Sequence, residues 1–252
     1  MPWPIRLGVP VAVAAAFLAV WWFAVIVSET VIFPSPRDVA IGALQLAREG
    51  TLWEHIGASL FRVGAGFLLA MAIGIPLGLL MGWKALAHTA LNPIVQVMRP
   101  ISPIAWIPIA ILWFGVGDVA PIFLIFLSAV FPTVVQTAAG VHTIEPQYLR
   151  AARNFGITRS RLILHVVIPA VLPQIIVGMR VSLGISWLVV VAAEMVTLRS
   201  GLGYMIIDAR NAGNRYDLVV AGMVIIGLIG LALDLGMRRL EGLKAVRWRY
   251  GR

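Results

Sequence analysis

The ionisable side chains that could do chemistry in this sequence stand inside long apolar runs. Arg180, Glu194 and Asp234 are each flanked by aliphatic residues. Burying an unpaired charge in lipid costs at least ~2.5 kcal/mol, so such residues pair with one another, face a water-filled pathway or couple ions. The four histidines are scattered, no His-Glu-x-x-His or Gly-x-Ser-x-Gly pattern occurs, and the chain has no cysteine. The residues therefore do not indicate an intramembrane enzyme or a metal site.

Composition and apolar runs define the fold class. Of 252 residues, 60% are hydrophobic and 12% are charged, whereas a soluble domain averages about 25% charged. Apolar runs longer than the ~18 residues expected of a membrane-crossing helix recur along the chain. We therefore predict an all-α polytopic membrane protein with about six transmembrane helices, at residues 9–27, 56–81, 91–114, 119–139, 172–198 and 218–237.

The distribution of basic residues predicts the orientation. If the N-terminus is inside, the inner segments carry twelve Lys and Arg and the outer segments five. Because short cytoplasmic loops keep basic residues, both termini are predicted to be cytoplasmic. The net charge of +9 then reflects topology, and nucleic acid is not an indicated partner because the charge is split among loops.

The spans divide the chain into three parts. Residues 1–56 contain the first span and an outer segment, residues 57–237 contain the transmembrane core, and residues 238–252 form a basic tail. The core includes an inner loop at residues 142–169.

Small residues recur at every fourth position in two spans, which favours close helix packing in lipid. The second span carries them at Gly66, Ala70, Gly74, Gly78 and Gly82. The fifth span carries them at residues 178, 182 and 186, and the same spacing continued by eight residues reaches the acidic residue 194.

The third span contains a segment that cannot form a regular helix. Residues 99–108 include three prolines, each of which lacks a backbone donor. Irregular backbone at membrane depth is tolerated only against protein or a water-filled cavity. We expect Pro103, Trp106 and Pro108 to line a solute pathway, or the segment to form a kink at the membrane surface. Arg180 could attract an anion in that pathway, or extend towards the cytoplasmic face.

The inner loop predicts two short helices in succession. Pro146 suits the first turn of a helix, and Gly156 is typical of the position just beyond its end, where φ is often positive. Thr158 could cap a second helix at residues 159–168, which we expect to end at Pro169 and Pro173.

The side chains of the first inner helix suit a protein contact. Ala151 and Ala152 lack bulk, so another protein could approach closely, while Tyr148, Leu149 and Phe155 offer apolar surface.

This pair of helices resembles the EAA loop of binding-protein-dependent ABC importer permeases. The pattern is Glu-Ala-Ala, three residues, Gly, nine residues, Ile, one residue and Leu-Pro. Ala151, Ala152, Gly156 and Pro169 match it, and Val166 and Ile168 stand at its Ile and Leu positions. Arg150 stands where the pattern has Glu, and Val and Ile replace Ile and Leu.

An ordered set of further motifs resembles the nitrate, sulfonate, taurine and bicarbonate branch of that family. The motifs are SLFRV at 59–63, Arg99-Pro100 with Pro103 and Pro108, WFGVG at 113–117, AEM at 193–195 and GLGYMI at 201–206.

The resemblance implies a type I ABC importer permease fold in the bacterial inner membrane. It implies a pathway for a small, anionic solute resembling nitrate, a sulfonate or taurine, delivered by a periplasmic binding protein. It also implies a second permease chain, usually an identical copy, and two ATPase subunits that hold ATP and Mg²⁺. The implied ATPase contact comprises Tyr148, Leu149, Arg150, Ala151, Ala152 and Gly156.

Catalysis and cofactors are not expected in this chain. The sequence has no Gly-x-x-x-x-Gly-Lys-Ser/Thr loop to hold a nucleotide phosphate, so the energy source must come from a partner.

Two outer segments are long enough to be structured. In residues 34–55, Val39, Leu44 and Leu46 precede Trp53, which predicts an amphipathic surface helix.

In residues 199–217, Tyr204 and Met205 are too apolar to remain in water and should fold back against the spans as an outer rim. Arg210 and Arg215 should stay accessible for docking of the binding protein. A passive connector is the alternative for this segment.

A secondary transporter is the competing class. It would use Glu194 and Arg180 within the membrane for ion coupling. Such carriers typically have internal repeats, and no convincing repeat occurs here. For Glu194, a static hydrogen bond between helices and a charge-dependent gate both remain open.

Overall fold

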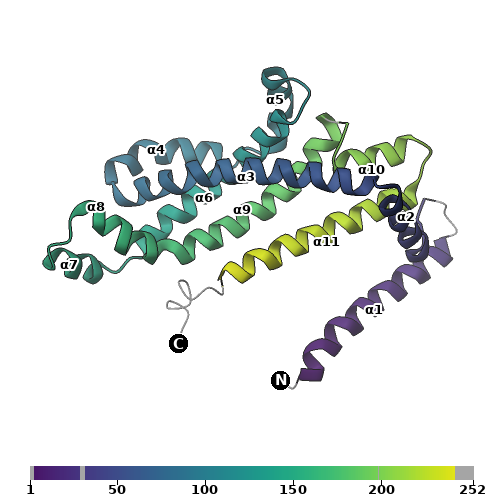
Figure 1. Cartoon of the computed structure of the whole chain (residues 1–252), viewed down its shortest axis with the longest axis horizontal. Helices are drawn as coiled ribbons and strands as arrows, with labels where there is room; N and C mark the ends of the chain where they lie inside the picture. The colour runs from purple at the N-terminus through teal and green to yellow at the C-terminus, as the bar shows by residue number, and fades with distance from the viewer. Residues whose placement is uncertain (1–2, 29–31, 198, 242–252) are drawn as a thin grey trace.

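The computed structural model describes residues 3–28, 32–197 and 199–241, and the described residues contain helices and no strands (Figure 1). The α-helices are α1 (Trp3–Ser28), α2 (Pro36–Glu49), α3 (Thr51–Trp83), α4 (Ala85–Met98), α5 (Ile107–Phe114), α6 (Val119–His142), α7 (Pro146–Asn154), α8 (Arg159–Leu162), α9 (Ile168–Thr197), α10 (Leu202–Asn211) and α11 (Tyr216–Glu241). A 3₁₀ turn, η1 (Pro103–Trp106), precedes α5, and a π-helical turn, η2 (Ile163–Val167), precedes α9.

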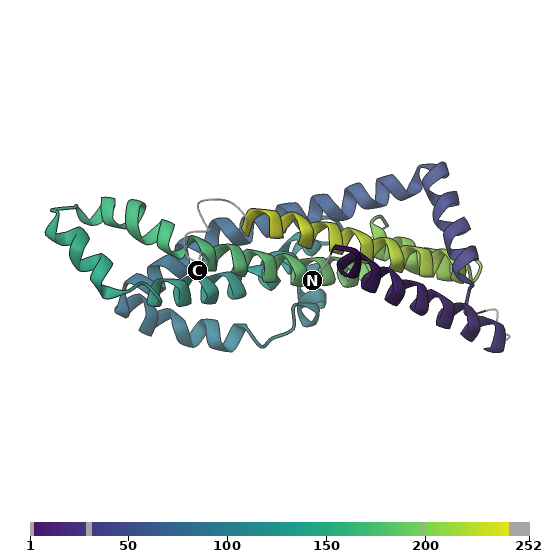
Figure 2. The same cartoon turned by 90° about the horizontal axis from the view of Figure 1, so that it is seen from below.

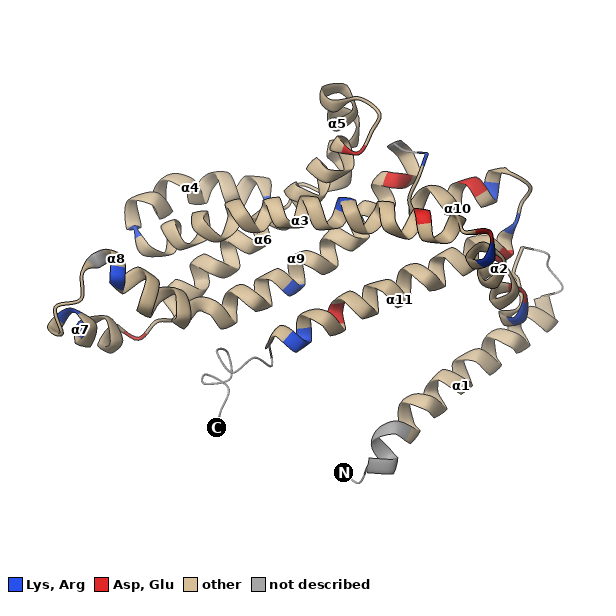
Figure 3. Ribbon diagram, in the orientation of Figure 1, with Lys and Arg blue, Asp and Glu red and all other residues tan. Residues whose placement is uncertain are grey.

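Five described helical segments are long and apolar enough to cross a membrane, and a bent pair would make a sixth. They include α1, α3, α6, the continuous helix ending in α9, and α11. Most charged residues lie near the ends of these helices (Figure 3). The predicted polytopic all-α fold is therefore confirmed.

The helices define two ends of an elongated bundle (Figures 1 and 2). Helices α7 and α8 project from one end, while α2 and α10 lie at the other. The N-terminal part of α1 and the C-terminal part of α11 are directed towards the end that carries α7 and α8. Helix α1 diverges from the bundle (Figure 1), and none of its side chains from Gly8 to Ser28 is buried.

The third predicted span is broken. Helix α4 and the segment Pro103–Phe114 meet at an angle of 84°. The two prolines beyond the break do not disrupt helix, because Pro103 lies in the first turn of η1 and Pro108 in the first turn of α5, where the missing N–H has no helical partner to lose. Irregular structure is thus confined to residues 99–102.

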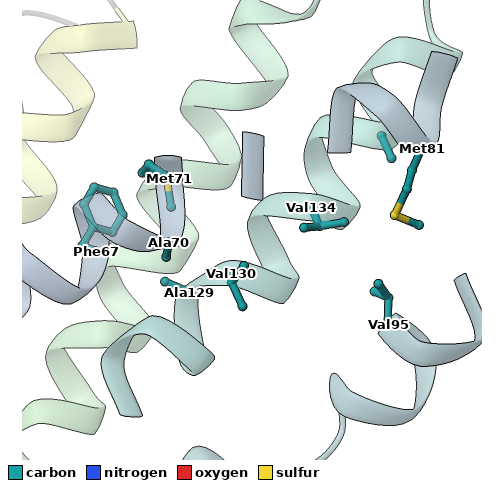
Figure 4. Packing of buried hydrophobic residues seen from close by; sticks show 9 residues of the cluster. Phe67, Ala70, Met71, Met81, Val95, Ala129, Val130 and Val134 are labelled. Carbon is teal, nitrogen blue, oxygen red and sulfur yellow. The ribbon is translucent and has the colours of Figure 1, made fainter. Parts of the chain in front are cut away.

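The core forms where α3, α6 and α9 pack together, with α4 against α3. Phe67, Met71 and Met81 of α3 meet apolar residues of α6 and α4 (Figure 4), among them Val130 and Val95. Close approach is possible because the predicted small-residue ridge of α3 faces α6, which confirms that prediction. A Cβ atom at Gly78 would lie 2.6 Å from Thr137 Cβ.

We expect Gly78→Ala to destabilise the bundle. The new methyl would also lie 2.7 Å from the carbonyl oxygen of Val134, and overpacking of this kind costs about 1–3 kcal/mol. Gly64→Ala is the matched control, because it lies on the same helix with nothing within 4 Å of its Cβ position. Thermal unfolding in detergent should show a lower midpoint for Gly78→Ala alone. Equal midpoints would show that the ridge does not determine the α3–α6 distance.

The predicted end of the second inner helix at Pro169 and Pro173 is wrong. Helix α8, η2 and α9 run on without interruption from Arg159 to Thr197. The π-helical turn ends at Val167, two residues before Pro169, and a local π-turn changes the hydrogen-bond pattern where the helix must include a residue that has no N–H. Thr158 precedes this helix, and its carbonyl oxygen accepts the Leu162 N–H at 2.8 Å.

Two further boundaries differ from the predictions. Helix α3 begins at Thr51, so the predicted limit between residues 56 and 57 falls inside it, and α11 extends past residue 237 to Glu241. The remainder of the predicted tail, residues 242–252, lies outside the described residues. The amphipathic outer helix is confirmed as α2, which starts with a reciprocal capping box between Ser35 and Asp38.

Candidate functional site

The inner end of the bundle presents α7 on a short projection. Gly156 follows the helix at φ +72°, as predicted. Tyr148 is 53% exposed and Phe155 is 85% exposed, so both aromatic rings face away from the chain. Ala152 is only 7% exposed, and Leu149 packs against the cluster formed by Val141, Val167, Val171 and Ile175.

The six residues predicted to contact the ATPase therefore divide into two groups. Tyr148, Arg150, Ala151 and Gly156 are exposed and available to a partner. Leu149 and Ala152 face the chain itself, because the apolar side of this short helix covers the ends of α6 and α9. The expectation that these two face outwards fails for that reason, and Phe155 takes the exposed place.

The outer end of the bundle contains a buried ion-pair network. The Arg62 guanidinium donates to Glu194 Oε1 at 2.7 Å, to Asp118 Oδ1 at 2.8 Å and to Ser200 Oγ at 2.6 Å. The side chain of Arg62 is 3% exposed and that of Glu194 is 0% exposed. Three helix segments distant in sequence, α3, α6 and α9, thus converge on one guanidinium.

Glu194 also holds the start of α10. Its Oε2 accepts the Gly203 N–H at 3.1 Å, and Ser59 Oγ accepts the Leu202 N–H at 2.9 Å while donating to Glu194. These groups satisfy free N–H groups at the first turn of a helix. Gly201 has φ +106°, and a Cβ atom there would lie 2.2 Å from the Glu194 carboxyl carbon, so only glycine fits.

The outer segment folds as predicted. Met205 is 5% exposed and Tyr204 is half-buried, whereas Arg210 and Arg215 are exposed. Arg215 is fixed by Asp217 at 2.8 Å and by Gln45 of α2. The charge of Asp208, with the hydrogen bond that it accepts, raises the pKa of the Tyr204 hydroxyl.

A cavity of about 450 Å³ lies at the break in the third span. Trp106 and Trp113 contribute to an aromatic wall with Phe123, and their ring centroids are 6.0 to 6.5 Å apart. Arg99 and Gln136 supply polar groups to the same cavity.

The five predicted pathway residues do not converge. Pro103 and Trp106 line the cavity, and Pro108 is exposed in the first turn of α5 without lining it. Arg180 instead bonds Asp234 of α11 at 2.6 Å, with both side chains about one-third exposed. Glu194 belongs to the outer network. The described residues include no group of three or more His, Asp or Glu side chains that could hold a metal ion.

Sequence reasoning identified Glu194 but missed its partner Arg62. The signal was present, because the four-residue spacing of the α3 ridge continued backwards from Gly66 reaches Arg62. The small-residue ridge of α3 therefore ends at a basic residue, and that of α9 ends at an acidic residue. The two helices pack together, so the two charges meet. Arg99 and Gln136 were also missed, since no spacing rule links α4 to α6.

The membrane-crossing helices enclose a cavity beside a broken span. One helix projects at the inner end, and Glu194 holds the outer segment by hydrogen bonds. These features are those of a membrane transport protein. The chain belongs to the family described as the inner membrane component of binding-protein-dependent transport systems, whose profile matches residues 74–244. It is thus a multi-pass membrane protein and the permease subunit of an ABC importer.

Individual relatives agree with this assignment. The taurine transport system permease protein TauC of Escherichia coli is 34% identical over 250 residues, which span 95% of this chain and 90% of the relative. The nitrate import permease protein NrtB of Synechocystis sp. is 36% identical over 241 residues, which span 92% of this chain and 87% of the relative. A bacterial alginate ABC transporter, solved with its periplasmic protein, shares the fold at 17% identity with a TM-score of 0.64, covering 94% of each chain.

Proposed function

We propose that this chain forms the solute pathway of an importer that draws its energy from two separate ATPase subunits. The observation that carries the proposal is the exposed aromatic surface of α7, which projects from a bundle whose sequence has no nucleotide-binding loop. ATP and Mg²⁺ are held by the partner in this proposal, and the permease itself is non-catalytic. The ATPase contacts Tyr148, Arg150, Ala151 and Phe155.

The proposed mechanism assigns separate tasks to the inner residues of α7. Leu149 and Ala152 seat the helix against α6 and α9, and Gly156 provides the left-handed turn that directs the chain back to α8. Movement of α7 is thereby transmitted directly to two core helices. ATP-driven closure of the ATPase pair would then change which side of the membrane the pathway opens to.

A second permease chain, most simply an identical copy, completes the assembly. Support comes from α1, which is apolar along its length and has no buried side chain between Gly8 and Ser28. The broken span is also exposed on a side that does not line the cavity, with Leu112 at 83% and the nearby Val116 at 75%. Purification of the tagged chain with its ATPase tests this arrangement, because native mass spectrometry should give two permease and two ATPase subunits. A monomeric permease without ATPase would overturn it.

We infer that the solute is a small anion resembling taurine, nitrate or a sulfonate. The relatives named for taurine and nitrate transport support the inference. A periplasmic binding protein delivers the solute to the outer end, where Arg210 and Arg215 are accessible. The α7 end faces the cytoplasm of a bacterial inner membrane, with both termini on that side, as the excess of basic residues there supports.

Cysteine labelling tests the two roles of the outer segment, and the native chain contributes no background because it has no cysteine. A membrane-impermeant maleimide should label Arg210→Cys rapidly in intact cells, and bound binding protein should protect it. Met205→Cys is buried and should react slowly until ATP is trapped and the rim opens. Phe155→Cys is the matched control, since it is exposed but on the cytoplasmic end.

Two results would contradict these assignments. Labelling of Phe155→Cys from outside would reverse the orientation. Labelling of residues 205 and 210 that responds neither to nucleotide nor to binding protein would leave this segment as a passive connector.

A further inference from the structure

Three arginines lie within the six predicted spans, and they differ in whether a carboxylate pairs with them. Arg62 bonds Glu194 and Asp118, and Arg180 bonds Asp234. Arg99 is exposed at the cavity beside the broken span, and it makes no side-chain hydrogen bond or ion pair with any residue that the structure describes. Because an unpaired charge at membrane depth is costly, such a residue marks a place where a counter-ion binds.

The depth of Arg99 restricts what that counter-ion can be. Helix α4 has 14 residues and returns along α3 from the inner turn at Lys84, so Arg99 is displaced from that turn by about 21 Å at 1.5 Å per residue. Helix α3 has 33 residues and is about 50 Å long by the same measure. Arg99 thus lies near the middle of the length of α3, away from either end of the bundle.

The walls of the cavity restrict the ligand further. Its volume of about 450 Å³ falls within the range of small-molecule sites, which combine apolar walls with a few polar groups. Trp106, Trp113 and Phe123 form a cluster of aromatic rings along it. The amide of Gln136, for which the structure gives no hydrogen-bond partner among the described residues, can donate beside Arg99.

We propose that this cavity binds an organic oxyanion, a sulfonate or carboxylate joined to an apolar body. The oxyanion accepts hydrogen bonds from Arg99 and Gln136, and the body lies against Trp106 and Trp113. This inference rests on the proposed import function and adds selectivity within the membrane for an organic anion over an inorganic one such as nitrate. A bare inorganic anion would leave the aromatic walls without contact.

Equilibrium binding to the intact permease–ATPase complex tests the inference. The complex is placed in phosphatidylcholine nanodiscs, and radiolabelled benzenesulfonate is the probe. Neutral benzenesulfonamide and nitrate serve as competitors, since the first lacks the charge and the second lacks the apolar body. Benzenesulfonate should bind, and each competitor should be at least about tenfold weaker, because each loses one of the two interactions.

Variants assign the binding to this cavity. Arg99→Gln should weaken benzenesulfonate binding by about tenfold or more, as loss of a charge-assisted hydrogen bond predicts, while Arg99→Lys should retain most of it. Trp113→Ala should weaken benzenesulfonate more than methanesulfonate, which has little to place against the ring. Arg239→Gln is the matched control, because Arg239 is an exposed arginine at the end of α11, outside the cavity.

The outcomes separate this inference from the proposed function. Absent benzenesulfonate binding, binding unchanged in Arg99→Gln, or equal binding of nitrate would overturn the cavity assignment, even if the complex imports solute with ATP. A chain that copurifies with no ATPase would instead overturn the proposed function, whatever its cavity binds. Copurified ATPase in Arg99→Gln shows that this variant is folded, so that its loss of binding supports the assignment.

Discussion

Arg62→Leu is expected to be the most destabilising single change in this protein. The substitution removes the cation that Glu194 and Asp118 share, and leaves the Glu194 carboxylate buried at 0% exposure without its charge partner. Breaking one side of a buried ion pair costs about 3–5 kcal/mol. Denaturation of the detergent-solubilised chain should show a decrease of that size in the free energy of unfolding. The start of α10, which Glu194 holds by a hydrogen bond, should also become less ordered.

Arg180→Leu provides the matched control for this effect. It also removes an arginine from a carboxylate pair between two helices, but both partners are about one-third exposed. Exposed pairs contribute about 0–1 kcal/mol, so Arg180→Leu should shift stability far less than Arg62→Leu. If both variants lose the same free energy of unfolding, then the cost of breaking the outer ion pairs does not come from their burial.

Substitutions at Glu194 distinguish a structural tie from a gate that needs charge. Gln keeps an oxygen that can accept from Gly203 N–H and Ser59 Oγ, whereas Leu keeps neither bond. If Glu194 is a tie, Glu194→Gln should retain uptake and Glu194→Leu should lose it. Loss of uptake in a folded Glu194→Gln variant would instead assign Glu194 to a charge-dependent gate.

Phe155→Glu combined with Tyr148→Glu is expected to abolish coupling to the ATPase. The two rings are the exposed apolar surface of α7, and loss of central aromatic contacts typically costs at least ~2 kcal/mol of binding, or about thirtyfold in affinity. ATPase copurification and uptake should both fall, while the amount of permease in the membrane stays unchanged because neither ring packs in the bundle.

Trp53→Glu is the control for this double change. Trp53 is 64% exposed, but it lies in the first turn of α3, directly after α2, and α2 is at the end of the bundle opposite α7, so its substitution should leave ATPase copurification intact. Gly156→Val should also uncouple the subunits, because a β-branched side chain is strained at φ +72°. Undiminished copurification in the double α7 variant would place the ATPase contact elsewhere.

The sequence predicted those features that follow from local spacing. The small-residue ridge of α3, the break near Pro103 and the left-handed turn at Gly156 each depend on residues within a few turns of one another, and the structure has all three. The start of α7 at Pro146 follows from the same kind of signal.

Features that depend on packing between distant segments could not be predicted in the same way. Whether Ala152 faces outwards depends on how the nine-residue helix α7 lies against α6 and α9. A helix pattern alone shows which face is apolar, but it does not show whether that face contacts the same chain or another protein. Arg180 and Glu194 are similar in sequence context, yet one pairs with Asp234 on a partly exposed flank and the other is enclosed by α3 and α10. Only the arrangement of the spans in the fold distinguishes the environment of Arg180 from that of Glu194.

The dependence of solute uptake on ATP hydrolysis tests the central claim most directly. The permease is reconstituted into liposomes with its ATPase and loaded binding protein, and uptake of the radiolabelled solute is compared between active ATPase and a variant inactivated at its catalytic residue. Uptake should require hydrolysis by the active ATPase and should be indifferent to imposed ion gradients. Uptake that continues with the inactive ATPase and follows an ion gradient would contradict the account and identify a secondary transporter.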